Sequence, residues 1–516
     1  MGTAGHFARS DALLRWNYCD GIMRIRLVIR RPLAVFVPKE EALKKIRWIA
    51  VLAVLSIIAA ACGGGGDTTT TAGNASGGDT PATTAAGDDT PATTAGGDDV
   101  VAAGFTLFGA PTGVEGDALA GFVDVYNAET GSDIQYTGSD DFESQLRIRV
   151  DGGDPPAVAF TPQPGSICTW ADEGALVSLE TMGFDIAAME ADHSKYWMDL
   201  GLCSDGEHYG IPWFPNFKSI VFYHEPTFTA QGYEIPETWE DMLALSQQIV
   251  DDGMTPWCFG FESGGATGWP GTDWLEDIVV RQSGSATYAD WVNHDIPFND
   301  PAIVSAFDTF GELFLADGFV LGGAENVAGV AFQDSPGPLF TDPTPGCLML
   351  KQGSFISNMF VDQPDFEAGE ESEIKTFSFP SIDGNVGAMG GGDTLIVFDG
   401  APENVQVVKD WISPDWGCTL ASASGGGVAK YGGHGVAGVE RLPGNKNVDP
   451  NCYETDAGKA FATSVTAALA ANTFVFDASD LMPAVVGQGS FWTAMVDWSR
   501  GASSQEVADT VENSWP

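Results

Sequence analysis

Three short runs predict the fold class of this chain: VAAGFTL (101–107), DIQY (133–136) and AVAF (157–160). Each run has the composition of a β-strand and ends near glycine or proline. The two segments between them, 115–130 and 139–150, carry apolar residues at helical spacing. Strands that alternate with helices indicate a parallel α/β sheet. In such sheets, ligands bind at the carboxyl ends of the strands.

The chain is long and strongly acidic. Its 516 residues suit two lobes plus further segments, since one domain usually spans about 150 residues. The first 61 residues hold ten basic and four acidic residues, which leaves 13 basic against 67 acidic residues. This charge repels nucleic acid and anionic membrane surfaces. We therefore expect no nucleic-acid partner, and we interpret the charge as a solvated acidic surface.

The N-terminal residues 1–61 predict a leader with a lipoprotein signal peptide. Basic residues at 44–47 precede the apolar run WIAVLAVLSIIAAA (48–61), and Cys62 follows. This order is typical of a secretory signal, and the run is shorter than the roughly 20 residues of a membrane span. The AAAC end resembles a bacterial lipobox, although Ala59 stands where a bulky residue is usual. The alternative is an ordinary signal peptide followed by a chance cysteine.

Residues 62–100 predict a lipidated cysteine and a disordered tether. The segment consists mainly of Gly, Thr, Ala, Asp and Pro, with the near-repeat DTPATTAAGD and DTPATTAGGD. Such a composition cannot bury enough apolar surface to offset its ordering entropy. We expect an extracytoplasmic protein held at the outer face of the cell membrane by its N-terminal lipid.

Six cysteines remain in the globular part, an even number that suggests disulfides in an exported chain. Fifteen pairings are possible, and we expect the sequential one. It joins Cys168 to Cys203, Cys258 to Cys347, and Cys418 to Cys452. The chain has no C-x-x-C pair, and no histidine lies close enough to the cysteines in sequence to suggest a zinc cluster, so we expect no metal and no cofactor.

The order of segments over residues 101–516 resembles the extracellular solute-binding proteins of carbohydrate ABC importers. Within this maltose-binding-protein-like group, it is most similar to the alpha-glucoside type. The stretches that carry the resemblance are DDFESQLRIRVDGGDPP (140–156), HYGIPWFPNFKSIVFY (208–223), TPWCFGFESGGATGWPGTDWLEDIVVR (255–281), GGGDTLIVF (390–398) and DASDLMPAVVGQGSFWTAMVDW (477–498).

The resemblance implies a two-lobe periplasmic-binding-protein-like α/β fold of type II, with a ligand cleft between the lobes. Lobe one is expected at 101–216 plus 387–437, and lobe two at 217–386 plus 438–516. The chain is expected to cross between lobes near 215–219, 380–388 and 436–446.

The resemblance also implies a monomeric substrate-binding lipoprotein that delivers a sugar, an alpha-glucoside or an oligosaccharide, to the permease subunits of an ABC importer. The sequence lacks a G-x-S-x-G elbow, an H-E-x-x-H motif and a P-loop, so we expect no enzyme. Two alternatives remain open. One is a binding protein for a polyol, peptide or polyamine, and the other is a lipid-anchored glycoside hydrolase, since the many acidic residues could include a catalytic pair.

A sugar site needs aromatic faces for the apolar sides of the rings, and polar groups for the hydroxyls. The stacking candidates are Trp213, Trp269, Trp274, Phe491 and Trp492. The polar candidates are Asp141, Gln163, Asn216, Lys218, Glu262, Asp273, Gly392 and Asp393. Several have a structural alternative. Trp213 could pack at the hinge and Trp274 against a helix, Asp141 could cap a helix, and Lys218 could pair with an acid.

Replacing Cys62 tests the lipid anchor. We expect Cys62→Ser to move the protein from the membrane fraction to the soluble fraction and to abolish lipid labelling. Cell fractionation and metabolic labelling with a fatty acid measure both effects. A variant that still partitions with membranes would contradict the lipobox interpretation.

Overall fold

The computed structural model describes residues 102–367, 370–421, 442–452, 463 and 474–516. The predicted leader, tether and Cys62 lie outside these residues, as does most of the third expected crossing, near 436–446. Among the described residues, no helix combines the length and apolar character needed to cross a membrane.

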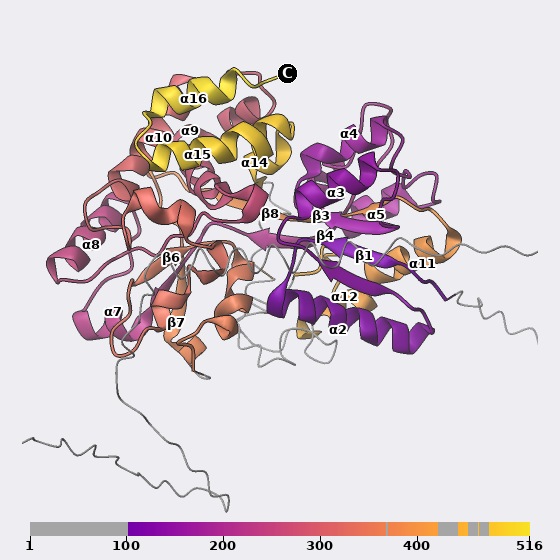
Figure 1. The fold of residues 1–516 in the computed structure, drawn as a ribbon, viewed down its shortest axis with the longest axis horizontal. Helices are drawn as coiled ribbons and strands as arrows, with labels where there is room; N and C mark the ends of the chain where they lie inside the picture. The colour runs from indigo at the N-terminus through magenta and orange to yellow at the C-terminus, as the bar shows by residue number, and fades with distance from the viewer. Residues whose placement is uncertain (1–101, 368–369, 422–441, 453–462, 464–473) are drawn as a thin grey trace, which may run out of the picture. The chain divides into compact units, whose positions relative to one another are not determined.

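The first lobe is built on a mixed sheet (Figure 1). The three predicted strands are present. The first of them in sequence, Thr106–Gly109, lies between the other two and pairs in parallel with both. In spatial order, the strands are β2 (Gln135–Gly138), β1 (Thr106–Gly109), β3 (Val158–Thr161), β8 (Ala388–Val397) and β4 (Ile211–Phe217), with β9 (Phe474–Phe476) beside β8. Strand β8 runs antiparallel to both of its neighbours on this path. The structure thus confirms the predicted α/β class.

Helices cover both faces of this sheet, which explains why the AVAF run is apolar throughout. Val158 and Phe160 face one core and Ala159 faces another, because successive side chains of a strand point to opposite faces. Figure 1 shows α3 and α4 on one face and α2 and α12 on the other. The helices of this lobe are α2 (Gly113–Thr130), α3 (Phe142–Asp151), α4 (Ile167–Asp172), α5 (Ile186–Asp192), α6 (Lys195–Asp199), α11 (Pro402–Trp411) and α12 (Pro414–Ala421).

The second lobe holds a smaller sheet and most of the long helices. The sheet has the order β6 (Met349–Lys351), β5 (Ile220–His224) and β7 (Ile374–Ser378). The helices include α7 (Glu225–Gln231), α8 (Trp239–Asp251), α9 (Trp269–Val292), α10 (Pro301–Phe314), α14 (Ala478–Leu481), α15 (Trp492–Ser499) and α16 (Ser504–Glu512). Buried aromatic side chains of α9, α10 and α15 form the largest core cluster of the protein.

The chain passes between the two sheets at two described points. Strand β4 belongs to the first sheet and β5 to the second, so one crossing lies at Lys218 and Ser219. The other joins β7 to β8 over residues 379–387. Residues 442–452 contact the first lobe, although we expected them in the second: the Gly444 amide donates to the Trp213 carbonyl at 2.8 Å. The expected lobe boundary placed all residues after 437 in lobe two, whereas this contact places residues 442–452 beside the first lobe.

Three disulfides connect Cys168 with Cys203, Cys258 with Cys347, and Cys418 with Cys452. The predicted sequential pairing is therefore confirmed. The first and third bonds lie in the first lobe, and the second joins segments that flank the sheet of the second lobe. The first bond ties α4 to the loop at Cys203, and the third ties α12 to the short segment at Cys452.

The bond between Cys258 and Cys347 encloses the longest loop, with a sequence separation of 89 against 35 and 34 for the others. A longer loop loses more entropy on crosslinking of the unfolded chain. We expect the double variant Cys258→Ala and Cys347→Ala to lose about 4 kcal/mol of unfolding free energy. The matched control, Cys168→Ala with Cys203→Ala, should lose less in the same urea titration. An equal or greater loss in the control would contradict this order.

Candidate ligand-binding cleft

A cavity of about 170 Å³ is lined by residues of both lobes. One water molecule needs only about 10–15 Å³ measured in this way, so the cavity can hold a small organic solute. The first lobe supplies the residues that follow its parallel strands, with Ala110 after β1, Ser139 after β2 and Gln163 after β3. This is the carboxyl edge of the sheet, where the sequence predicted ligand binding.

Trp269 forms an aromatic wall of the cavity together with Phe332 and Phe355. Its ring centroid lies 5.0 Å from that of Phe332 and 6.0 Å from that of Phe355. Lys218 Nζ lies 5.1 Å from the centre of the Trp269 ring. Trp269 is half-buried, so part of its surface is available to a solute.

Glycine at position 268 allows Trp269 to take this place. Gly268 has a φ of 117° and precedes the first residue of α9. A Cβ atom here would stand 2.1 Å from the carbonyl oxygen of Trp492, so any other residue would push the two segments apart. Trp269 and Trp492 therefore border the same cavity from two different helices.

Carboxylate and amide groups form the polar part of the wall. Gln163 Nε2 donates to Glu143 Oε1 at 3.2 Å, and Asn358 Nδ2 donates to Glu115 Oε1 at 3.3 Å. The second bond joins the two lobes, since Glu115 lies on α2 and Asn358 on η6 (Ser354–Asp362). Burial raises the pKa of Glu143. Asn358 Oδ1 is buried without a hydrogen-bond partner among the described residues and can accept one from a solute.

Under the cavity, Lys218 makes two buried ion pairs. Its Nζ lies 2.9 Å from Asp273 Oδ1 and 2.6 Å from Asp477 Oδ2. Burial alone lowers the pKa of Lys218, but Asp273, Asp477 and the nearby Asp480 raise it well above its ordinary value. The lysine is therefore a permanent cation that a buried carboxylate must balance.

The two carboxylates that face Lys218 titrate differently. Burial raises the pKa of Asp273 to about 8, and the charge of Asp477 adds to the increase while Lys218 opposes it. Burial also acts to raise the pKa of Asp477, but Lys218 and hydrogen bonds lower it to about 2. Near pH 7 the dominant ion pair is thus Lys218 with Asp477, and Asp273 is largely protonated.

One face of α9 extends this buried network to the second crossing. Asp277 accepts a hydrogen bond from Ser219 Oγ at 2.6 Å, contacts Arg281 and lies 3.2 Å from Lys351 Nζ. The Arg281 guanidinium donates to the carbonyls of Pro380 and Gly387, each at 2.9 Å. Both crossings are therefore bonded to the same helix.

The structure brings seven of the predicted site residues together in the lining of the cavity. They are Gln163, Asn216, Lys218, Trp269, Gly392, Asp393 and Trp492. Their ligand contacts remain a prediction.

Three predicted stacking residues belong to the core instead, and we correct these assignments. Trp213 is 2% exposed and stacks on Phe214 and Trp411. Trp274 is 1% exposed and packs with other aromatic rings of the second lobe. Phe491 is fully buried in the same cluster. Nearby glycine and proline fix the backbone and leave the direction of the side chain open, so they did not distinguish a loop from a core position.

Three predicted polar residues also lie outside the lining. Asp273 is 2% exposed and pairs with Lys218 below the cavity. Asp141 occupies the N-cap position of α3 without a side-chain capping bond. Glu262 accepts a hydrogen bond from the amide of Gly264 at 2.9 Å and thus supports the turn before Trp269.

Several lining residues were not among the predicted ones: Glu115, Asp140, Glu143, Phe332, Phe355, Asn358, Asp477 and Asp480. Asp140 follows a strand of the parallel sheet, and this position was a usable signal. Glu115 and Glu143 lie in the first turns of two helices that start at the same sheet edge. Phe332 and Asn358 lie in short 3₁₀ segments, whose sequence carries no periodicity that predicts their direction.

The fold and the cleft define a class of protein: a two-lobe receptor of the type II periplasmic-binding-protein fold. Residues 110–413 match the family model of the bacterial extracellular solute-binding proteins, which covers more than half of the chain. The chain belongs to this family.

Two curated relatives match most of the chain. The osmoprotective compounds-binding protein GgtB of Synechocystis is 38% identical over 80% of this chain and 92% of its own length. The alpha-glucosides-binding periplasmic protein AglE of Rhizobium meliloti is 36% identical over 80% of this chain and 86% of its own length. Both matches therefore span most of this chain and most of each relative.

Solved structures agree on the fold at much lower identity. The bacterial solute receptor AcbH superposes with a TM-score of 0.63 at 18% identity, over 80% of this chain and 98% of that one. Maltose-bound MalE3 of T. maritima gives a TM-score of 0.59 at 14% identity, over 80% of this chain and 98% of that one. At these identities the likeness supports the architecture alone.

The raised pKa of Asp273 predicts a pH dependence of stability. Its folded pKa of about 8 exceeds its ordinary value of 3.8, so between these two pH values the folded state holds a proton that the unfolded state has lost. Stability should therefore fall as the pH rises through this window, by up to about 1.4 kcal/mol per pH unit from this group. Asp273→Asn, which mimics the protonated form, should flatten the decline. Urea unfolding at pH 5, 6, 7 and 8 measures the slope.

The control is Asp509→Asn. Hydrogen bonds from Asn299 and Gln505 lower the pKa of Asp509, so this carboxyl stays ionised in both states across the window. The slope of the control should match that of the unsubstituted protein. If Asp273→Asn leaves the slope unchanged as well, Asp273 is ionised in the folded state and the assignment is wrong.

Proposed function

We propose that this protein is the substrate receptor of an ABC importer and that its cleft captures a neutral sugar, an alpha-glucoside or a short oligosaccharide. The aromatic wall of Trp269, Phe332 and Phe355 beside carboxylate and amide groups is the observation that carries this proposal. Sugar rings present apolar C–H faces that pack on aromatic rings, and their hydroxyls donate to carboxylates and amides.

The polar wall favours a solute with many hydroxyl donors. Its side chains include the carboxyl groups of Glu115, Asp140, Glu143, Asp393 and Asp480, whereas Lys218 is the one lysine or arginine among the described residues that line the cavity. Such a wall disfavours anionic solutes, because their charge would face carboxylates. The relative GgtB is named for binding osmoprotective compounds, so these compounds should also be tested as ligands. The relative AglE is named for binding alpha-glucosides, which supports that class.

The setting of the receptor is part of the same proposal. Cys62 anchors the chain by lipid at the outer face of the cell membrane, and the segment 63–100 lets the lobes reach the permease subunits. The protein acts as a monomer and turns over no substrate. Incubation with chromogenic glycosides tests the rival hydrolase function, which would release the chromophore.

A thermal-shift screen tests the ligand class. Alpha-glucosides and oligosaccharides at about 100 times their Kd should stabilise the protein by about 2.7 kcal/mol, because only the folded state binds them. Glycerol, spermidine and a tripeptide serve as the competing classes. Stabilisation by one of these classes, with none from any sugar, would overturn the sugar assignment.

Trp269→Ala should weaken binding of the sugar found in this screen by about 2 kcal/mol, which is roughly 30-fold, because it removes an aromatic face from the cleft. Calorimetric titration measures the affinity. The unliganded protein should keep most of its stability, since Trp269 lies at the edge of the core.

Trp274→Ala is the matched control on the same helix. Trp274 is 1% exposed, so its removal should cost about 3–5 kcal/mol of unfolding free energy. A Trp269→Ala protein with unchanged affinity and a large drop in melting temperature would contradict the stacking role.

A further inference from the structure

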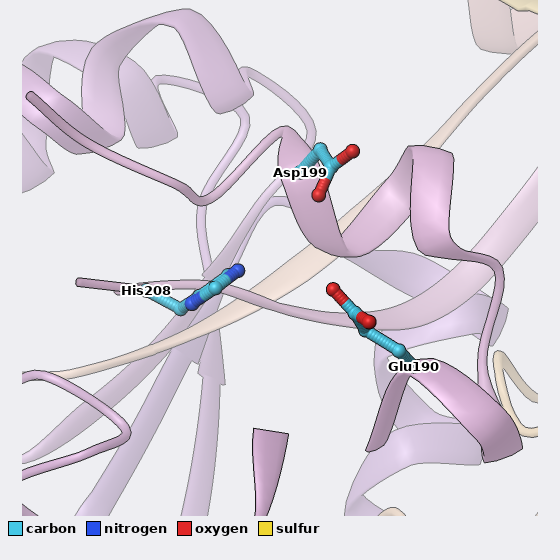
Figure 2. Close-up of side chains that lie close together, drawn as sticks. All are labelled: Glu190, Asp199 and His208. Atoms are coloured by element: carbon cyan, nitrogen blue, oxygen red, sulfur yellow. The ribbon is translucent and has the colours of Figure 1, made fainter. Parts of the chain in front are cut away.

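A second group of potential ligand atoms lies on the first lobe, outside the cavity lining. It consists of Glu190 on α5, Asp199 on α6 and His208, which precedes β4. One side-chain oxygen or nitrogen of each residue lies within 4.8 Å of those of the other two. Figure 2 shows the imidazole of His208 directed towards the two carboxylates.

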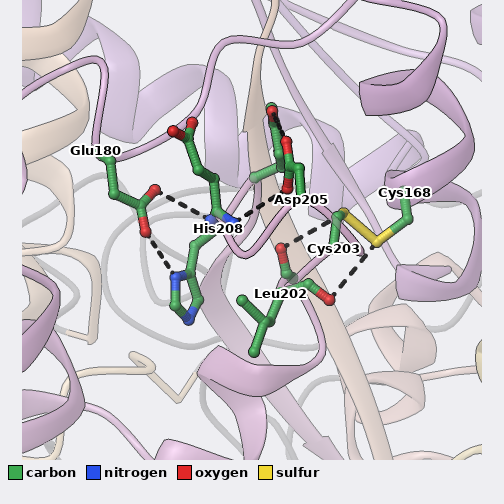
Figure 3. Close-up of a disulfide and its surroundings, with 9 residues drawn as sticks. Cys168, Glu180, Leu202, Cys203, Asp205 and His208 are labelled. Atoms are coloured by element: carbon green, nitrogen blue, oxygen red, sulfur yellow. Dashed lines mark hydrogen bonds and ion pairs between the residues drawn. A yellow bond between two sulfur atoms is a disulfide. The ribbon is translucent and has the colours of Figure 1, made fainter.

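The imidazole of His208 is held in one orientation by Glu180. His208 Nδ1 lies 2.9 Å from Glu180 Oε1, and the backbone amide of His208 donates to Glu180 Oε2 at 3.0 Å (Figure 3). A carboxylate only accepts, so Nδ1 carries the proton. In the neutral ring, the lone pair is then on Nε2.

Nε2 of His208 is buried and has no hydrogen-bond partner among the described residues. The side chain is 8% exposed. A buried polar atom without a partner costs about 1–3 kcal/mol, so its position requires a reason. A histidine that donates Nδ1–H to a carboxylate and offers Nε2 has the arrangement found around bound metal ions.

Lys195 now balances the charge of the two carboxylates. Its Nζ lies 3.0 Å from Glu190 Oε1 and 2.6 Å from Asp199 Oδ1. The lysine side chain is 62% exposed, and such surface pairs contribute little to stability. The ammonium can therefore move into solvent at small cost. It carries one positive charge, whereas a divalent cation would match the two negative charges of the carboxylates.

The surroundings of the three residues are rigid enough to hold an ion. The disulfide between Cys168 and Cys203 ties the segment before His208 to α4 (Figure 3). Leu202 also pairs with His208 through the backbone. The two carboxylates are less confined by packing, since Glu190 is 31% and Asp199 40% exposed. They can move the short distance to a tetrahedral site, whose ligand atoms stand about 3.3 Å apart at bond lengths of about 2.0 Å.

We propose that Glu190, Asp199 and His208 form a metal site that binds one Zn²⁺ ion in place of the Lys195 ammonium, with Glu180 as the residue that orients His208. One imidazole and two carboxylates suit Zn²⁺, whereas Ca²⁺ and Mg²⁺ prefer oxygen ligands alone. The ion would tie α5 and α6 to the segment that leads into β4. The spacing in sequence gave no sign of this site, because each ligand comes from a different element.

Zinc titration of the full chain tests the site. EDTA-stripped protein, with Cys19 and Cys62 alkylated in every sample, is titrated with ZnCl₂ by calorimetry and melted with and without the ion. We expect one Zn²⁺ per chain, a higher melting temperature with Zn²⁺ and a smaller effect of CaCl₂. Glu190→Gln and His208→Gln should each weaken binding at least tenfold, and Glu180→Gln should weaken it by about 10- to 100-fold.

Two further variants keep the test decisive if a His208 substitution reduces folding. Lys195→Ala removes the competing ammonium and should strengthen Zn²⁺ binding. His294→Gln is the matched control. His294 pairs with one carboxylate, that of Glu512 at 3.1 Å, and stacks on Trp515, so its replacement should leave the affinity unchanged. Equal Zn²⁺ affinity of the unsubstituted, Glu190→Gln and His208→Gln proteins would overturn the site. Weaker binding by Lys195→Ala or equally tight binding of Ca²⁺ would overturn it too.

Discussion

The rest of the structure depends on the buried ammonium of Lys218 at the crossing between β4 and β5. A buried charge is tolerated only with good partners, and removing one partner typically costs about 3–5 kcal/mol. Here the partners come from α9, through Asp273, and from the start of α14, through Asp477. The crossing, the longest helix of the second lobe and the C-terminal region are thereby fixed to one point, and the same lysine contacts Trp269 at the cavity.

This arrangement explains how the cleft can take residues from two lobes and still be specific. Arg281 binds the carbonyls at both ends of the second crossing, so both crossings are fastened to α9, which also begins with Trp269. The aromatic wall is thus rigid relative to the crossings. The polar wall belongs partly to the first lobe, and one of its contacts with the second lobe is the bond from Asn358 to Glu115. A solute with several hydroxyls can replace that contact and bond to both lobes at once.

The sequence predicted those parts of the fold that have a regular pattern. Strand β3 was recognised because the AVAF run that contains most of it is apolar throughout and both faces of the strand are buried. The even cysteine count indicated disulfides, and the expected sequential pairing was one of fifteen possibilities. The site was predicted less well. Trp269 and Trp274 have similar neighbours in sequence, yet one borders the cavity and the other is core, because the direction of α9 decides the matter. Asp273 and Lys218 were proposed as separate ligands, whereas the fold brings their side chains into direct contact.

The positions of the few basic side chains change how the net charge of the chain is interpreted. Lys218, Arg281 and Lys351 are all buried, and each faces carboxyl or carbonyl groups at the crossings. Among the described residues, most Asp and Glu side chains are half-buried or exposed. Salt screens exposed charges strongly and buried pairs weakly. Raising the ionic strength therefore reduces the repulsion among surface carboxylates and leaves the junction of the lobes intact, so the acidic surface and the buried cations act on stability independently.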